Sequence, residues 1–350
     1  MNNLLDIYTD YLISSFSETT ATGLSRLLDG EVSHDKVTRF LSTYNFSSSY
    51  LWSLVKRTVR EIEMDDGVLI FDDTIEEKLY TDENEIVNWH FDPSYGRTIK
   101  GINILNALYH VKDVSVPVAF EIIHKPILYC DIKTRKIKRE SNVTKNDLLR
   151  HILTTCQNNQ LNYKYVLTDI GYASNENMQH IKLKIKKDFV MAMKSNRLVA
   201  LTLEDKKQGN FVRIDSLSLE DGTTQLVYLK GLDFTVQLTK QVFKNKDDSE
   251  GILYLVSSDI NLTSEQIITI YQKRWNVEVF HKSIKSNTSL SKSPTRTLKT
   301  QSNHIFASIY AAFKLEILKL KHHTNHFALK SKLYLKALQA SFSELEKLSA

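Results

Sequence analysis

The chain has 350 residues, of which 42% are hydrophobic and 25% are charged. This composition is typical of a soluble globular protein with room for two or three domains, and the formal charge of +5 permits a polyanionic partner without requiring one. Its two cysteines, Cys130 and Cys156, lack metal-binding spacing, which argues against a zinc finger and a disulfide scaffold. No apolar run approaches membrane-spanning length and no signal peptide is evident, so we expect a cytoplasmic protein without membrane association.

Residues 1–63 read as a small helical segment. Apolar residues recur at helical spacing over 21–28, a turn with Gly30 follows, and a second helix is expected over 34–41. Two short helices around a glycine-bearing turn fit a helix-turn-helix that binds DNA, although an ordinary helical hairpin has the same pattern. A third helix is expected over 48–63.

Residues 64–196 change character and predict a mixed α/β layer. The expected elements are, in chain order, strands over 67–73, 102–110 and 114–123, a helix over 142–157, a strand over 163–167, a helix over 174–185 and a strand over 189–193. Pro117 indicates an edge position for the third strand. Residues 133–139 are a basic run, which is either a solvated loop or a phosphate contact.

Residues 197–260 break this alternation and read as an all-β insertion without a strong helix. Residues 261–290 follow as a helix-bearing return to the α/β layer. The last segment, 291–350, is expected to be mainly helical, after a Ser/Thr/Lys-rich loop over 289–301. The predicted fold class is therefore a mixed sheet with flanking helices, an all-β insertion, and helical segments at both ends.

One helix near the C-terminal end carries an unusual polar stripe. Thr263 and Gln266 form a capping box, and no Pro or Gly interrupts the sequence from there to Ser286. At roughly 100° per residue, three side chains lie within about 60° of Tyr271 on the helix surface; they are Arg274, Glu278 and Lys285. Apolar residues flank the stripe on both sides, so we expect the helix to be buried against a sheet, with Trp275 packed in the core.

Three acidic positions stand in or at the end of regular elements. Asp72 and Asp73 close the first strand, Asp169 follows the fourth strand, and Glu278 lies on the polar stripe. Each acid alone is more simply a capping or salt-bridged residue. Together, and without Cys or His ligands of suitable spacing, they fit a hard cation such as Mg²⁺ or Mn²⁺.

The tyrosine–arginine–glutamate–lysine spacing resembles the YREK signature of bacterial insertion-sequence transposases with a DDE triad. Asp73-Thr74 is similar to the first-acid motif of that group, and the sequence from Asp169 to Tyr172 is similar to the second. The all-β stretch resembles the insertion that interrupts the RNase H-like fold of these enzymes. The resemblance covers about residues 65–290.

The resemblance implies roles for these residues. Asp73, Asp169 and Glu278 would hold two divalent ions. Neighbouring strand residues point to opposite faces, so only one of Asp72 and Asp73 can join the site directly, and Asp72 is the alternative first ligand. DNA phosphates would be held by Tyr271, Arg274 and Lys285, with Trp275 and Lys282 nearby. A flipped base would stack on an aromatic; the candidates are Trp275, Phe211, Tyr228 and Phe234.

The implied activity is that of a DNA transposase, which cuts transposon ends and joins them to target DNA, working as a homodimer on DNA. An RNase H-like nuclease without strand transfer and a domesticated, non-catalytic DNA-binding protein are the alternatives. A further group has spacing that could bind a metal, in a Lys-rich helical stretch where no acid or cysteine is expected nearby; it consists of His322, His323 and His326. We therefore expect these histidines to lie on a solvated or DNA-facing surface.

Overall fold

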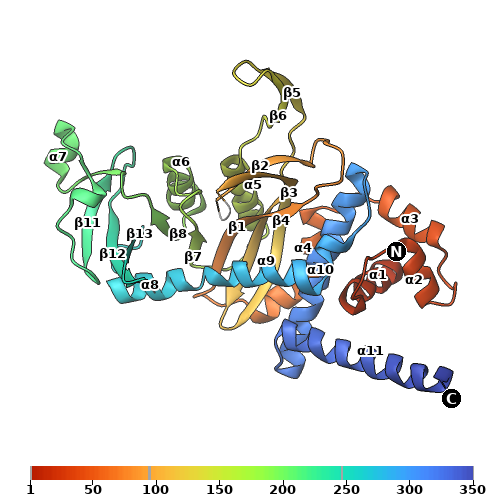
Figure 1. Cartoon of the computed structure of the whole chain (residues 1–350). Helices are drawn as coiled ribbons and strands as arrows, with labels where there is room; N and C mark the ends of the chain where they lie inside the picture. Colours follow the sequence, from red (N-terminus) through yellow and green to blue (C-terminus); the bar gives the residue numbers. More distant parts are fainter. Residues whose placement is uncertain (1, 94–95, 246, 350) are drawn as a thin grey trace.

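An eleven-stranded sheet forms the centre of the computed structural model, which describes residues 2–93, 96–245 and 247–349 (Figure 1). Its strands are β1 (Val68–Glu77), β2 (Asn88–Asp92), β3 (Arg97–Val111), β4 (Val114–Ile122), β7 (Tyr165–Thr168), β8 (Asp188–Met193), β9 (Leu198–Ala200), β10 (Val212–Arg213), β11 (Thr224–Leu229), β12 (Val236–Lys244) and β13 (Glu250–Ser257). A separate two-stranded ribbon consists of β5 (Ile127–Asp131) and β6 (Lys136–Glu140).

The strand order is β10-β9-β11-β12-β13-β8-β7-β1-β3-β2, with β4 also paired to β3. The pairs β1–β7 and β7–β8 are parallel, and the other pairs are antiparallel. This mixed sheet with flanking helices confirms the predicted RNase H-like fold class. β1 lies between β3 and β7, and its first four residues, Val68 to Phe71, are fully buried, as expected for a central strand covered on both faces.

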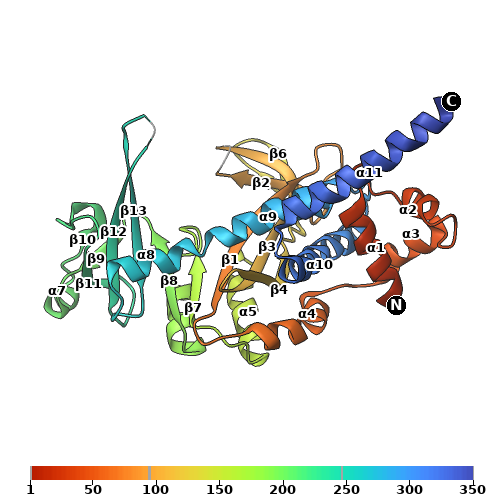
Figure 2. The ribbon, with the colours of Figure 1, turned by 90° about the horizontal axis from the view of Figure 1, so that it is seen from below.

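Helices cover the sheet and form both ends of the chain (Figure 2). They are α1 (Asn2–Ser14), α2 (Ala21–Leu27), α3 (His34–Thr43), α4 (Ser48–Ile62), α5 (Lys145–Asn158), α6 (Asn175–Gln179), α7 (Leu203–Gln208), α8 (Ser264–Gln272), α9 (Trp275–Asn287), α10 (Leu298–His322) and α11 (His326–Ser349), with one π-helical turn, His180–Ile185, and two 3₁₀ turns, Ile214–Ser216 and Leu290–Lys292. α9 packs on β1, α8 packs on β8, β12 and β13, and α10 packs on β4 and α1. None of the described helices is long and apolar enough to cross a membrane.

The predicted α/β elements are present in order, but the structure adds the strand β2 and the β5–β6 ribbon, which were not predicted, and the first strand is longer than expected. β1 continues to Glu77 because its pairing with β3 is unbroken from Val68↔His110 to Glu77↔Gly101. Asp72 and Asp73 therefore lie in the middle of the strand, and the prediction that they close it was wrong. The edge position of Pro117 is confirmed among the described residues, since β4 pairs with β3 alone.

Three local expectations differ from the structure. Residues 197–260 contain the six-residue helix α7, begun by the Thr202 cap, so the segment is not purely β. The basic run at 133–139 is not a plain loop, because most of it forms the turn and second strand of the β5–β6 ribbon. The expected loop at 289–301 contains a 3₁₀ turn and the start of α10, which Thr297 caps.

The helix expected through Tyr271 and Lys285 is two helices, α8 and α9, joined by a tight turn. The capping box of Thr263 and Gln266 is confirmed at the start of α8. At the junction the amides of Lys273, Arg274 and Asn276 each donate to the carbonyl three residues earlier. These 3₁₀-type bonds overwind the chain locally, and α9 then continues in nearly the same direction (Figure 1).

The N-terminal helices form a compact corner against α10. α2 and α3 are joined by a turn in which Gly30 has φ of +82°, a conformation that favours glycine. Val37 and Phe40 on α3 are buried, while Lys36 and Arg39 are exposed. The expected helix–turn–helix order is present, and its role in binding DNA stays a prediction.

Candidate active site

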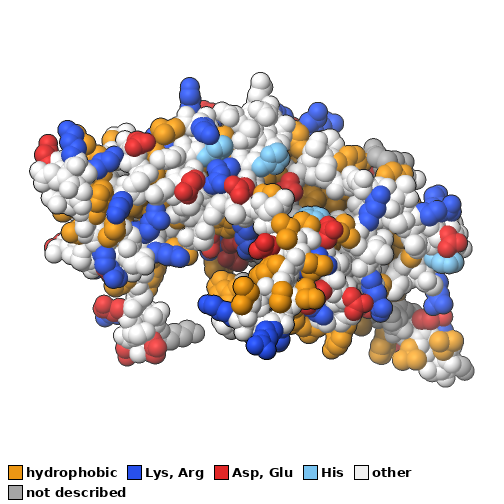
Figure 3. Space-filling model, turned by 90° about the horizontal axis from the view of Figure 1, so that it is seen from above, with side chains coloured by type: hydrophobic (Ala, Val, Ile, Leu, Met, Phe, Trp, Pro, Cys, Tyr) orange, Lys and Arg blue, Asp and Glu red, His pale blue; other side chains and the backbone are white. Residues whose placement is uncertain are grey.

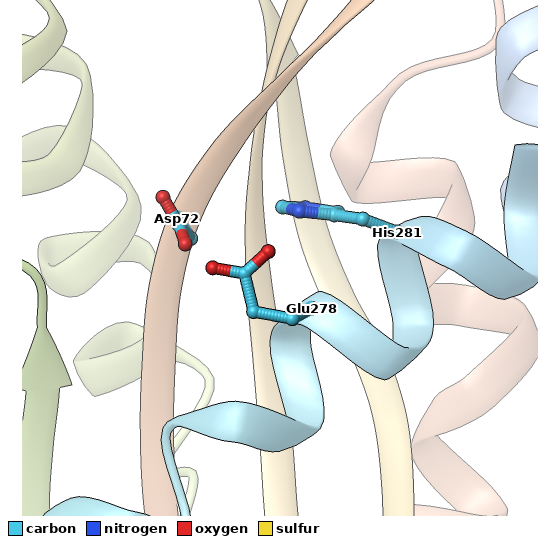
Figure 4. Close-up of side chains that lie close together, drawn as sticks. All are labelled: Asp72, Glu278 and His281. Carbon is cyan, nitrogen blue, oxygen red and sulfur yellow. The ribbon is translucent and has the colours of Figure 1, made fainter. Parts of the chain in front are cut away.

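Asp72 and Glu278 approach each other across the space between β1 and α9. Their carboxylate oxygens and a ring nitrogen of His281 lie within 4.8 Å of one another. Figure 4 shows the Glu278 carboxylate directed from α9 toward Asp72 on β1, with His281 one helical turn further on. Arg274 binds both acids: it donates to Asp72 Oδ2 at 2.8 Å and to Glu278 Oε1 at 3.3 Å. The two carboxylates therefore share one guanidinium.

Asp73 faces the other way and has different partners. Lys145 Nζ, at the start of α5, donates to its Oδ2 at 2.6 Å, and the Tyr172 hydroxyl donates to its Oδ1 at 2.5 Å. Burial by itself would raise the pKa of Asp73, but Lys145 and these two hydrogen bonds lower it overall. Both carboxylate oxygens of Asp73 are thus already occupied by protein donors.

Asp169 follows β7 directly and lines one cavity together with Asp72 and Asp73. Its Oδ1 accepts a hydrogen bond from the amide of Gly171 at 3.0 Å. A Cβ at position 171 would lie 3.2 Å from that oxygen, so the glycine allows the loop to fold tightly over the carboxylate. Burial raises the pKa of Asp169, and the neighbouring Asp73 charge adds to the increase.

The cavity that joins these side chains has a volume of about 740 Å³, and we call it the acidic cavity. The charged residues that line it are Asp72, Asp73, Asp92, Asp169, Glu278, Lys145, Arg274, Lys282 and Lys285. Figure 3 shows the face seen from above, where acidic side chains are recessed between Lys and Arg side chains. The fold thus brings together all four acids that the sequence analysis selected.

The balance of charge in the acidic cavity fits a bound divalent cation. Burial raises the pKa of Asp72 to about 8, and the negative charge of Asp169 contributes, while Arg274 opposes the shift only in part. A further cation at this position would lower the pKa of Asp72 and favour its ionised form. Asp72, Asp169 and Glu278 supply the oxygen ligands that Mg²⁺ and Mn²⁺ prefer, so the donor set fits the expected metal.

His281 is a residue near the acids that the sequence analysis did not select as a ligand. It lies three residues after Glu278, a spacing that places both side chains on one helix face. Its Nε2 lies 3.1 Å from Asn106 Nδ2, and burial lowers its pKa to about 3, so the ring is neutral. The Glu-x-x-His pattern was the sequence signal for this neighbour.

The polar stripe brings both of its cations to the cavity. Arg274, Lys282 and Lys285 line it, and Lys285 Nζ donates to the carbonyl of Ile75 on β1 at 2.8 Å. Tyr271 is partly buried, and the Cζ atom of Arg274 lies over its ring, 5.9 Å from the ring centroid. Burial raises the pKa of Tyr271 to about 12. Tyr271 is not among the described residues that line the cavity.

The expected burial of both sides of this helix was half wrong. Val277, Phe280 and Ile284 are buried, but Trp275 is 67% exposed and Val279 is also exposed. The expected core position of Trp275 is therefore corrected, because the helix packs on β1 with one face only.

The other aromatic candidates also lie away from the described cavity lining. The rings of Phe211 and Tyr228 contact Lys230 and Lys206, and Phe234 packs near Phe189. Phe91 on β2, which the sequence analysis did not select, lines the cavity and is exposed.

The histidines near the end of α10 also differ from expectation. His322 and His323 are exposed, whereas His326 is partly buried. Its Nε2 contacts Glu316 Oε2 at 2.8 Å and its Nδ1 contacts Ser283 Oγ at 2.8 Å. The expected absence of a nearby acid was wrong, because α10 and α11 fold back and bring Glu316 to His326.

An RNase H-like sheet with acids from β1, β7 and α9 at one cavity defines the class of protein, and two comparisons define the family. The family described as DDE superfamily endonuclease matches residues 2–209, and the family described as Transposase DDE domain matches residues 134–313. Each match covers more than half of the chain. The protein belongs to the DDE superfamily of endonucleases and transposases, whose members act on DNA and usually use divalent metal ions.

Two other comparisons add little. No curated protein matches the sequence. Among solved structures, endonuclease V from Bacillus subtilis is similar at 10% identity, with a TM-score of 0.29, over 68% of this chain and 95% of that one. A similarity at this level carries no argument about function.

Proposed function

We propose that the protein is a transposase of the YREK type, which cuts the ends of a mobile DNA element and joins them to target DNA. The observation that carries this proposal is the convergence of Asp72, Asp169 and Glu278 at the acidic cavity, beside Arg274 and Lys285. Acids alone would fit any metal-dependent nuclease. The cations from the same helical stripe as Glu278 are what favour a site that also holds DNA phosphates.

Asp72, rather than Asp73, is the better first metal ligand. The Asp72 carboxylate accepts from the backbone amide of Asp73 and from Arg274, a cation that it shares with Glu278, whereas Asp73 is bound by the ammonium group of Lys145 and the hydroxyl of Tyr172. We propose that Asp72, Asp169 and Glu278 hold two Mg²⁺ or Mn²⁺ ions. Such ions, when bound, activate the attacking water or 3′-hydroxyl and stabilise the leaving oxygen.

The remaining residues act on the substrate. Lys282 and Lys285 lie at the cavity and would bind phosphates as point charges, while the planar guanidinium of Arg274 suits bidentate contact. Lys145 also lines the cavity, and its ammonium group donates to Asp73. The proposed DNA strand therefore contacts cations that come from α5 as well as from the polar stripe.

The other segments have proposed roles as well. We assign residues 1–63 to DNA binding, 64–196 and 261–290 to the catalytic core, 197–260 to an insertion and 291–350 to a C-terminal helical region. The exposed Lys36 and Arg39 on α3 are suited to a DNA contact. The protein would act as a homodimer on DNA, in the cytoplasm of a bacterium.

A two-stage assay tests the proposal. The first stage incubates the protein with DNA that carries the sequences flanking its gene, in Mg²⁺, and measures strand cleavage. The second stage supplies a pre-cut end and a plasmid, and measures joining. Cleavage and joining that both disappear in Glu278→Gln, with unchanged folding by circular dichroism, are expected.

Each other outcome has a definite meaning. Cleavage without joining would identify a nuclease that does not transfer strands. Salt-sensitive DNA binding without metal-dependent cleavage would identify a non-catalytic DNA-binding protein. Full activity in Glu278→Gln would overturn the assignment of the site.

A further inference from the structure

The C-terminal helix α11 is attached to the body only near its start. His326 contacts Ser283 on α9 and Glu316 on α10, and Lys330 donates to the carbonyls of Ile13 and Ser15 at the end of α1. The last aromatic contact joins Tyr334 to Phe16, with ring centroids 5.1 Å apart. No described residue of α11 is buried, and Figures 1 and 2 show the helix extending away from the body.

The projecting part of α11 carries a stripe of large apolar side chains. The spacings between its members are three, four and three residues, which is the a/d pattern of a coiled coil; they are Leu335, Leu338, Phe342 and Leu345. All four are exposed, and Phe342 is 66% exposed. A contiguous exposed apolar stripe of this kind marks an interaction surface.

The spacing of the stripe is symmetric, so the stripe is complementary to a second copy of itself. When two copies run antiparallel, Leu335 lies opposite the partner's Leu345 and Leu338 lies opposite the partner's Phe342. Both pairings use one register, since each pair is centred on position 340. A two-fold interface requires this self-complementarity.

The charges beside the stripe favour the antiparallel direction over the parallel one. One flank of the stripe carries three polar residues at seven-residue spacing: Lys332, Gln339 and Glu346. In an antiparallel pair, this flank lies beside the same flank of the partner helix. Lys332 then meets the partner's Glu346, twice by symmetry, and Gln339 meets the partner's Gln339. In a parallel pair the same flank faces the opposite one, which carries Tyr334, Ser341 and Leu348, so no opposite charges meet.

We propose that α11 pairs with α11 of a second copy as a short antiparallel coiled coil, and that this contact joins two molecules without DNA. The apolar stripe supplies the contact area, and the pairs of Lys332 with the partner's Glu346 set the direction. The contact uses no residue of the acidic cavity. If the α11 contact is disproved, the proposed catalytic function still stands. If the catalytic function is disproved, the α11 contact still stands.

The first experiment measures oligomeric state by sedimentation of the full chain without DNA or divalent metal. The wild-type protein is expected to be a dimer, and Leu338→Ser with Phe342→Ser is expected to be a monomer. Ala340→Ser is the matched control, because position 340 lies on the opposite side of the helix from the stripe. Circular dichroism at low concentration checks that all variants are folded; the body should be unaffected because α11 contributes no buried residue.

The second experiment tests direction by charge reversal. Lys332→Glu and Glu346→Lys are each expected to weaken the dimer by roughly 3- to 10-fold in Kd, the range for surface ion pairs counted twice. The double reversal should restore the wild-type Kd. Lys336→Glu and Glu344→Lys, which change charges outside the flanks, should have little effect.

The third experiment fixes the register. In a Cys130→Ser background, Gln339→Cys is expected to form a disulfide between copies under mild oxidation, because the two positions face each other across the two-fold axis. A monomeric wild-type protein, or a dimer that is insensitive to the stripe variants, would overturn the proposal. A dimer that is lost in Leu338→Ser with Phe342→Ser, but that forms no disulfide in the Gln339→Cys variant, would overturn the antiparallel direction.

Discussion

The two faces of β1 carry neighbouring aspartates in opposite electrostatic settings. Asp72 faces α9, where other carboxylates surround it and burial raises its pKa to about 8. Asp73 faces α5, where Lys145 and Tyr172 bind it and its pKa is lowered. Asp72 shares one guanidinium, that of Arg274, with Glu278, whereas Asp73 pairs with the ammonium group of Lys145. The difference teaches that neighbouring acids on one strand can have opposite electrostatic settings, and it is the reason for proposing Asp72, whose cation is shared, as the metal ligand.

The largest effect is expected from Asp72→Asn. Cleavage of DNA in Mg²⁺ should fall by more than about 100-fold, since even an outer partner of a metal ligand is worth about 10- to 100-fold. Glu77→Gln changes an exposed acid on the same strand and serves as the matched control. A single-turnover cleavage assay measures both. Normal cleavage by Asp72→Asn, together with loss of cleavage in Asp73→Asn, would show that Asp73 and not Asp72 is the metal ligand.

A second effect is expected on stability. Mg²⁺ at 100 times its Kd should raise the free energy of unfolding by about 2.7 kcal/mol, because the ion binds the folded chain and not the unfolded one. The increase should be absent in Asp72→Asn and retained in Asp73→Asn. Thermal unfolding with and without Mg²⁺ measures it, independently of cleavage. Equal stabilisation of all three proteins would mean that the ion binds elsewhere.

A smaller effect is expected from Lys145→Gln. DNA affinity at low salt should fall by about 10-fold, the equivalent of about 1.4 kcal/mol, as one charge-assisted contact is lost. Asp73→Asn should weaken binding less, and the double variant should be no worse than Lys145→Gln, because Asp73 acts through Lys145. Fluorescence anisotropy over a salt series measures these affinities. Additive losses in the double variant would assign Asp73 a role of its own.

The smallest effect is expected from Tyr172→Phe. The variant removes one hydrogen bond to Asp73 and leaves the contact with Lys145 in place. Cleavage should therefore fall only a few-fold, and Mg²⁺ should still stabilise the protein. Cleavage rates and thermal unfolding of the wild type and the variant give the comparison. A loss as large as that of Asp72→Asn would show that the hydroxyl takes part in the reaction itself.

Much of the fold and the site was accessible from the sequence. The alternation of apolar strands and amphipathic helices predicted the α/β layer, and the positions of the acids predicted that β1, β7 and α9 would meet. The choice between Asp72 and Asp73 was not accessible, because alternation along a strand says that the two faces differ but not which face α9 covers. The partners of Asp73 come from Lys145 and Tyr172, which are distant in sequence.

Other features depended on tertiary packing that leaves little trace in the sequence. Trp275 reads as a core residue by type, yet the second face of α9 is left uncovered. The turn at Arg274 contains no Pro or Gly that would predict it. Only a change from four-residue to three-residue hydrogen bonding separates α8 from α9. The partner of His326, Glu316, lies in the preceding helix and meets it only after the chain reverses at His323, which has a left-handed conformation.

The continuation of β1 beyond its two aspartates has a thermodynamic consequence. The backbone on both sides of Asp72 is paired with β3, so the conformational entropy lost in ordering this acid is already spent when the sheet forms. Glu278 has a longer side chain, 39% of which is exposed, and keeps more rotamer freedom. In the proposed site, the side chain of Glu278 therefore adjusts to an arriving ion, while the sheet already fixes the position of Asp72.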